Sequence, residues 1–162
     1  MKSLNLPNQK IDEAHGINIL SKLNVVDNLN FDRLKWKLRE TGEYEAEALE
    51  FAEVEYKRFL KLLLLFPKEI LVPSKAMDLF WHEHILDTRN YVKDTGQIFG
   101  RYLHHNPYFG GDKLEHEVWE ETYNKTKRLY QQTYNQFMDG LKQQCAGDNG
   151  DDGSCFAGTS DE

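Results

Sequence analysis

The segment from Ser74 to Asp94 constrains the fold more than any other part of the chain. Ser74 is a residue type that favours the start of a helix, and Gly96 favours its end. With about 100° of rotation per residue, Leu79 and Leu86 lie opposite a broad apolar face. A helix that is apolar on two sides needs cover on both, so we expect a central helix with neighbours on each flank. The broad face consists of Met77, Trp81, His84, Thr88, Tyr91 and Val92.

Apolar periodicity indicates helices in the rest of the chain as well. We expect them at residues 8–26, 30–41 and 42–66, and a short one at 97–103 after the central segment. A capping-box pattern at residues 112–115 opens a long final helix. No segment shows the alternation of apolar and polar residues that would indicate a β-strand instead. The sequence therefore predicts an all-α fold: an irregular helical bundle with a central WHxH helix and a long C-terminal helix.

The C-terminal tail, residues 144–162, differs in composition from the chain before it. It holds five acidic residues, no lysine or arginine, and both cysteines, Cys145 and Cys155. The net charge of the whole chain is −7, so the preceding part is nearly balanced. We expect one domain over residues 1–143 and a disordered acidic tail. Without a basic stripe, direct nucleic-acid binding is not expected, and the expected partner is a protein.

Hydropathy predicts a cytoplasmic protein. The first residues, MKSLNLPNQK, contain no apolar segment of the kind that signal peptides have. The longest apolar run, residues 62–67, is far shorter than a membrane span. Because both cysteines lie in the tail, no disulfide framework is indicated.

The expected helix at 42–66 has an acidic first half and basic residues in the following turns. This order of charges complements the helix dipole, and Glu53 and Lys57 have the spacing of a favourable pair. We interpret the acidic half as a solvated face rather than a cation site.

Four of the six histidines lie within residues 80–107. On a regular helix His82 and His84 are about 200° apart, so they face different neighbours. If the helix is central, we expect both imidazoles to be buried and hydrogen-bonded. His82 has Asp78 one turn before it, and His84 has Asp87 or another segment. One interpretation is therefore that these are satisfied core histidines that order the helix packing.

The alternative interpretation is a metal site. Two histidines two residues apart are poorly placed to bind one ion from the same helix. A site would combine one of them with a carboxylate and a histidine of the loop at 104–105, and would leave a position for water. The ion would be a divalent transition metal. The candidate ligands are His82, His84, His105, Asp78 and Asp87.

The remaining histidines have structural interpretations. His104 and His105 could cap the C-terminus of the preceding helix, where positive charge is favoured. His15 and His116 stand in polar, helical surroundings, and we expect both at the surface.

Common catalytic motifs are missing from the sequence. It contains no GxSxG elbow, no GxGxxG or Walker loop and no CxxC pair. Both cysteines lie in the tail rather than in a walled pocket, so a serine or cysteine hydrolase is not indicated.

Residues 77–109, MDLFWHEHILDTRNYVKDTGQIFGRYLHHNPYF, resemble the domain shared by plant glycine-rich domain proteins and their bacterial relatives. A looser similarity extends over residues 10–140, and many bacterial members also end in Gly- and Cys-rich segments. Family members often have cysteine after the Asp of a Tyr-x-x-Asp element, whereas this chain has Thr95 there. The matching positions are Phe80, Trp81, His82, His84, Asp87, Tyr91, Phe99, Gly100, His105 and Pro107.

The resemblance implies a mostly helical domain without an assigned biochemical activity. It points to His82, His84 and His105. Structural or pocket-forming roles are expected for Trp81, Tyr91, Phe99, Gly100 and Pro107.

Three functions are compatible with these patterns. The first is a non-catalytic binding or scaffold domain with a histidine–aromatic cluster at its centre. The second is a metal-binding domain, or metalloenzyme, that uses His82 or His84, His105 and a nearby aspartate. The third is a carrier or precursor whose tail is modified at Cys145 or Cys155.

Overall fold

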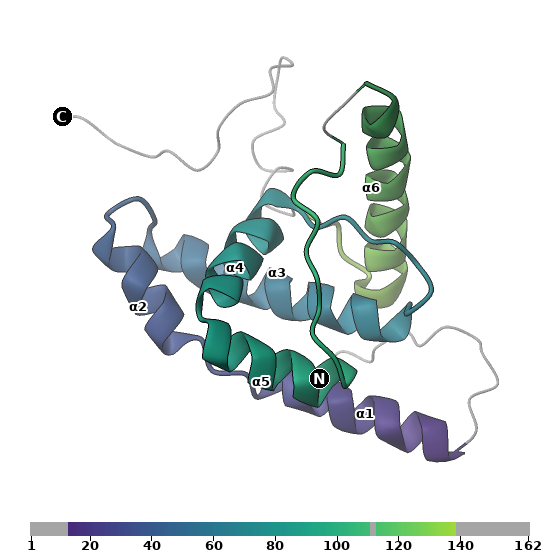
Figure 1. Cartoon of the computed structure of the whole chain (residues 1–162), viewed down its shortest axis with the longest axis horizontal. Helices are drawn as coiled ribbons and strands as arrows, with labels where there is room; N and C mark the ends of the chain where they lie inside the picture. The colour runs from purple at the N-terminus through teal and green to yellow at the C-terminus, as the bar shows by residue number, and fades with distance from the viewer. Residues whose placement is uncertain (1–12, 111–112, 139–162) are drawn as a thin grey trace.

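The computed structural model describes residues 13–110 and 113–138, and these residues form an irregular all-α bundle without a strand (Figure 1). The all-α prediction is confirmed. The expected capping residue at 112 and the C-terminal tail lie outside the described residues. The helices are α1 (Glu13–Asp27), α2 (Asp32–Glu40), α3 (Ala46–Leu65), α4 (Lys75–Leu86), α5 (Thr88–Phe99) and α6 (Lys113–Tyr134).

The WHxH helix, α4, contributes to the core of the bundle, as the sequence predicts, but helices cover only one of its two expected flanks, and Leu86 on the other is 65% exposed. It packs most extensively against α3 and also contacts α5, while α1 contacts both α3 and α5. Large apolar side chains from three helices fill the space between them, because each helix presents an apolar stripe to the others. The buried residues of this core on α3, α4 and α5 include Tyr56, Phe59, Leu60, Leu62, Met77, Phe80, Trp81, Tyr91 and Ile98.

The predicted continuous helix from Ser74 to Asp94 is wrong, because the chain turns at Asp87. Asp87 has φ −82° and ψ 65°, so it ends α4 and begins α5. Its carboxylate accepts a hydrogen bond from the Asn90 side chain at 2.7 Å. Aspartate is common before the first turn of a helix, because its side-chain oxygen can accept a hydrogen bond from a free backbone N–H there. At Asp87 the carboxylate accepts from the Asn90 side chain instead of from the backbone. One result of the turn is that Thr88 and Val92 are exposed instead of joining the apolar face.

The end of α5 also differs from the prediction. The helix continues through Gly96 to Phe99, so neither the expected stop at Gly96 nor a separate helix at 97–103 occurs. Gly100 is the residue that ends it, with φ 71° in the left-handed region that glycine adopts without steric cost. The chain from Gly100 onward then runs back past α4 towards α6 (Figure 1).

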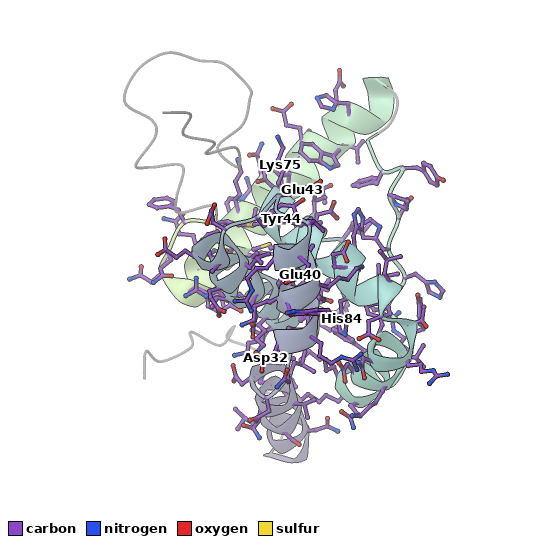
Figure 2. The ribbon with its side chains drawn as sticks, turned by 90° about the vertical axis from the view of Figure 1, so that its left-hand side faces the viewer. Asp32, Glu40, Glu43, Tyr44, Lys75 and His84 are labelled. Atoms are coloured by element: carbon purple, nitrogen blue, oxygen red, sulfur yellow. The ribbon has the colours of Figure 1, made fainter. Side chains whose placement is uncertain are left out.

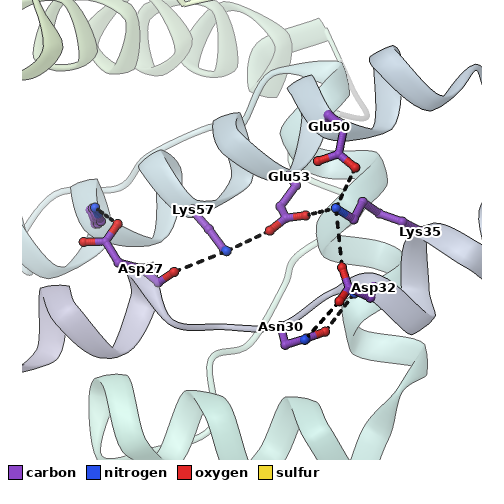
Figure 3. A network of polar contacts seen from close by, with 8 residues as sticks. Asp27, Asn30, Asp32, Lys35, Glu50, Glu53 and Lys57 are labelled. Carbon is purple, nitrogen blue, oxygen red and sulfur yellow. Dashed lines mark hydrogen bonds and ion pairs between the residues drawn. The ribbon is translucent and has the colours of Figure 1, made fainter.

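The acidic half of α3 is only in part a solvated face (Figure 3). Glu53 and Lys57 pair at 2.7 Å, as their spacing predicts. Glu53 also binds Lys35 of α2 at 2.7 Å, and Lys35 is only 8% exposed. Burial alone would lower the pKa of Lys35, but the carboxylates of Glu50 and Glu53 outweigh it and raise that pKa. The prediction of a solvated face is wrong at Glu53, because its carboxylate joins α2 to α3.

Glu55 is the second exception, and it attaches α6 to α3. It is buried, and its Oε1 accepts hydrogen bonds from Arg58 and from the Tyr130 hydroxyl, each at 2.7 Å. The Tyr134 hydroxyl donates to the Arg58 carbonyl at 2.8 Å. These contacts lie in the second half of α6, and the first half extends away from the other helices (Figure 1).

None of the described helices has both the length and the apolar character needed to cross a membrane.

Candidate metal centre

The two histidines of the WHEH stretch have different environments. His84 is 2% exposed, whereas the side chain of His82 is 47% exposed. The expectation that both are buried is therefore wrong for His82. Neighbouring helices cover the side of α4 that carries His84, but the side that carries His82 is only partly covered, by the segment after α5.

His84, which is labelled in Figure 2, is a core residue. Its hydrogen bonds join α4 to α3 and α5. Its Nδ1 lies 3.0 Å from the Tyr56 hydroxyl of α3, and its Nε2 lies 3.2 Å from Oδ2 of Asp94 on α5. Burial raises the pKa of Tyr56 well above its ordinary value, so the hydroxyl stays protonated and donates to Nδ1. The neutral ring then donates its Nε2 proton to Asp94. Asp87, the partner considered from sequence, is instead exposed at the turn.

This arrangement predicts a dependence of stability on pH. Burial lowers the pKa of His84 below its ordinary 6.5 and outweighs the attraction of the Asp94 and Asp87 carboxylates. At pH values below about 6.5 the imidazole of His84 binds a proton in the unfolded chain but not in the folded chain. The contribution of His84 to stability therefore decreases as the pH is lowered below 6.5. Above pH 6.5 it is fully present.

We expect the free energy of unfolding in urea to decrease between pH 7.5 and pH 5.5, and a His84→Gln variant to lose part of that slope. Comparing the two proteins removes the contribution of other titrating groups. Equal slopes in both would show that His84 does not supply the dependence.

Asp78, His82 and His105 converge on one point at the surface, and we call them the triad. Asp78 and His82 are one turn apart on α4, so their side chains lie on the same face. Oδ1 of Asp78 lies 2.8 Å from Nε2 of His105 and 3.7 Å from Nε2 of His82. One nitrogen or oxygen from each residue lies within 4.8 Å of the others.

These separations suit a metal ion. Nitrogen and oxygen ligands lie about 2.0–2.2 Å from a transition metal, so two ligands on one ion are about 3–3.5 Å apart. The two measured separations, 2.8 and 3.7 Å, fall on either side of this range. The ligand atoms of His82 and His105 lie within 4.8 Å of each other, so this third pair would have to approach the same range for all three residues to bind one ion. Two imidazoles and one carboxylate are a common donor set for divalent transition metals.

The position of His105 is fixed by two buried aromatic residues. The Trp81 indole donates to the Tyr91 hydroxyl at 2.8 Å, and this hydroxyl donates to the Leu103 carbonyl at 2.5 Å. Burial raises the pKa of Tyr91 to about 12, so the hydroxyl stays protonated. The Trp81 ring also meets the His105 ring edge to face, with centroids 4.5 Å apart. These contacts hold the segment after α5 against α4, which orients the ligand from the second segment.

The other candidates from the sequence lie outside the triad. His84 and Asp87 are not part of it, and His104 is exposed, with its ring against Tyr102. His116 is exposed as expected, while the side chain of His15 lies outside the described residues. Of the residues expected to be structural, Trp81 and Tyr91 are buried, Phe99 is half-buried, Gly100 ends α5, and Pro107 is exposed.

Sequence reasoning missed three groups that organise this region: Tyr56, Asp94 and the carbonyl of Leu103. Tyr56 was detectable, because it precedes Phe59 and Leu60 at the i+3 and i+4 positions of a helix. Asp94 becomes a partner of His84 only because the chain turns at Asp87, and no local pattern shows that. A carbonyl has no signature in a sequence.

Comparison with known proteins identifies the family. A family model described as UCP032817-like matches residues 21–110, which is more than half of the chain. The chain belongs to the UCP032817-like family. The UCP032817-like segment runs from within α1 to the loop after α5, so it contains the whole triad and excludes α6. No curated protein and no solved structure matches the chain.

Proposed function

We propose that this UCP032817-like protein binds one divalent transition metal ion at Asp78, His82 and His105. The observation that carries the proposal is the convergence of three ligand atoms within 4.8 Å, from a helix and from a loop. Asp78 and His82 supply an i,i+4 pair on α4, and His105 supplies the ligand from the second segment. Three protein ligands are the number found in zinc sites that keep a position for water.

The donor set favours some metals over others. Imidazole suits zinc, copper, iron, cobalt and nickel, whereas magnesium and calcium prefer sites made of oxygen ligands. The triad contains no thiolate, so it is unsuited to soft ions such as Cu(I). We therefore propose a borderline divalent ion, with zinc as the first to test.

The other hypotheses from sequence stay proposals. The buried contacts of His84 with Tyr56 and Asp94 support an architectural role for that half of the histidine–aromatic cluster, and such a role is compatible with a scaffold domain. The similarity to glycine-rich domain proteins rests on residues that include His82 and His105, two members of the triad. The carrier hypothesis concerns Cys145 and Cys155, which lie outside the described residues.

Calorimetric titration tests the metal proposal. Full-length protein, produced without a polyhistidine tag and stripped with a chelator, is titrated with Zn²⁺, Co²⁺ and Ni²⁺. We expect one equivalent to bind, and at a free metal concentration 100 times the dissociation constant, the free energy of unfolding should rise by about 2.7 kcal/mol. The same titration with a Cys145→Ser/Cys155→Ser variant separates the triad from the two thiols. If no ion binds that variant at a one-to-one ratio, the proposal is wrong.

A further inference from the structure

A cavity of about 350 Å³ lies beside the second half of α6. It belongs to the part of the chain that follows the UCP032817-like segment, and it shares no residue with the triad. Four of its lining side chains recur at i, i+3, i+4 and i+7, so one wall is a single face of α6, and the other two follow the helix. The lining residues are Asn124, Lys127, Arg128, Gln131, Phe137 and Met138.

The cavity exists because the chain changes direction at the end of α6. Asn135 has φ 50°, in the left-handed region that asparagine enters more readily than most residues. Its N–H donates to the Gln131 carbonyl at 2.8 Å. The two residues after the turn then return to the face of α6, where Met138 is 6% exposed and Phe137 is 54% exposed. The second wall is therefore apolar, with one buried side chain and one exposed aromatic ring.

The helical wall is positively charged, although the net charge of the whole chain is −7. Residues 122–138 contain three cationic side chains and no aspartate or glutamate. Lys125 pairs with Glu69 of the segment before α4. Within the part of the chain that the structure describes, neither Lys127 nor Arg128 forms an ion pair. Two uncompensated positive charges thus line the cavity.

We propose that this cavity binds a small organic anion, with its anionic head at Lys127 and Arg128 and its apolar body against Phe137 and Met138. A guanidinium donates two parallel hydrogen bonds to a carboxylate or to a phosphate, and the two side-chain amides on the same face of α6 can donate further ones. The volume of the cavity falls in the usual range of small-molecule sites, about 300–1,000 Å³. The proposal is independent of the metal site, which lies on α4 and the segment after α5.

A nuclear magnetic resonance titration tests the proposal and locates the ligand. Amide spectra of full-length, metal-free, ¹⁵N-labelled protein are recorded with sodium phenyl phosphate and, separately, with sodium benzoate, which share a ring and differ in the anionic head. Inorganic phosphate supplies a head alone, and benzyl alcohol supplies a ring alone. We expect at least one ring-bearing anion to bind with a dissociation constant in the millimolar range or below, and each part alone to bind at least about fivefold more weakly. The shifted amides should belong to residues 124–138.

A matched pair of double variants separates the cavity from general attraction of anions to a charged surface. Lys127→Gln/Arg128→Gln should weaken binding of the ring-bearing anion by at least about tenfold, because charge-assisted hydrogen bonds are lost. Arg89→Gln/Lys93→Gln removes the same two charge types from the exposed surface of α5 and should leave the dissociation constant within about twofold of the wild-type value.

Binding of either ring-bearing anion with these losses supports the proposal, and the tighter of the two identifies the head group. The absence of a saturable shift with both anions overturns it. Equal losses in the two double variants, or shifts confined to residues outside 124–138, also overturn it. Equal affinities for phenyl phosphate and inorganic phosphate would show that the apolar wall holds no ligand body, which contradicts an organic anion.

Discussion

A His105→Ala variant is expected to bind Zn²⁺ at least about 100-fold more weakly than the wild-type protein, since the loss of an outer partner alone costs roughly 10–100-fold. His105 is the only member of the triad that lies outside α4. Without it the ion keeps only Asp78 and His82, one turn apart on a helix, and two ligands hold such an ion far less tightly than three. Competition with a chromophoric chelator measures the change.

His104→Ala is the matched control for this variant. His104 precedes His105 on the same segment, but it is exposed and lies against Tyr102 rather than at the triad. Its removal should leave the dissociation constant within about threefold of the wild-type value. Equal losses in the two variants would mean that the segment is disturbed in general, and an unchanged affinity in His105→Ala would place the ion elsewhere.

The second large effect concerns stability. A His84→Ala substitution is expected to lower the free energy of unfolding by about 3 kcal/mol. It removes a fully buried ring and leaves a cavity between α3, α4 and α5. It also removes the acceptor of the buried Tyr56 hydroxyl and the donor to Asp94. Urea unfolding at pH 7.5 gives the difference between the two proteins.

His116→Ala serves as the control for truncation of a histidine. That side chain is exposed on the first half of α6, so the change should remain within about 0.5 kcal/mol. A loss below about 1 kcal/mol in His84→Ala would contradict the architectural role that its burial and two polar contacts imply.

The helices could be predicted from this sequence because the apolar residues that become buried recur with the helical period of about 3.6 residues. The apolar spacing placed five of the six described helices near their observed positions. The two-sided apolar character of residues 74–86 predicted cover on both flanks of α4, and this is wrong for one flank, because Leu86 is 65% exposed and Leu79 is only half-buried. The break at Asp87 was missed because apolar periodicity continues across it, and only the preference of aspartate for helix starts pointed to it.

The chemistry of the candidate site could be predicted, but not its assembly. Sequence alone indicated that a metal site would combine one histidine of α4, a carboxylate and a histidine of the following loop. It did not separate His82 from His84, or Asp78 from Asp87, because that choice depends on which side of α4 the returning segment covers. The path of that segment is set by the turn at Asp87 and by the Trp81–Tyr91–Leu103 hydrogen bonds, which are tertiary contacts.

The turn at Asp87 also shortens the distance that the chain must span to close the site. A straight helix over residues 75–99 would put Asp78 and Phe99 about 31 Å apart, at about 1.5 Å per residue. The six residues from Gly100 to His105 could then cover about 21 Å at full stretch, which leaves roughly 10 Å to the Asp78 backbone, so the two side chains could meet only if the segment were fully extended. Because the chain turns at Asp87, near the middle of residues 75–99, the end of α5 lies closer to Asp78 than it would in a straight helix. The side chains of Asp78 and His105, 27 positions apart in the sequence, meet at 2.8 Å.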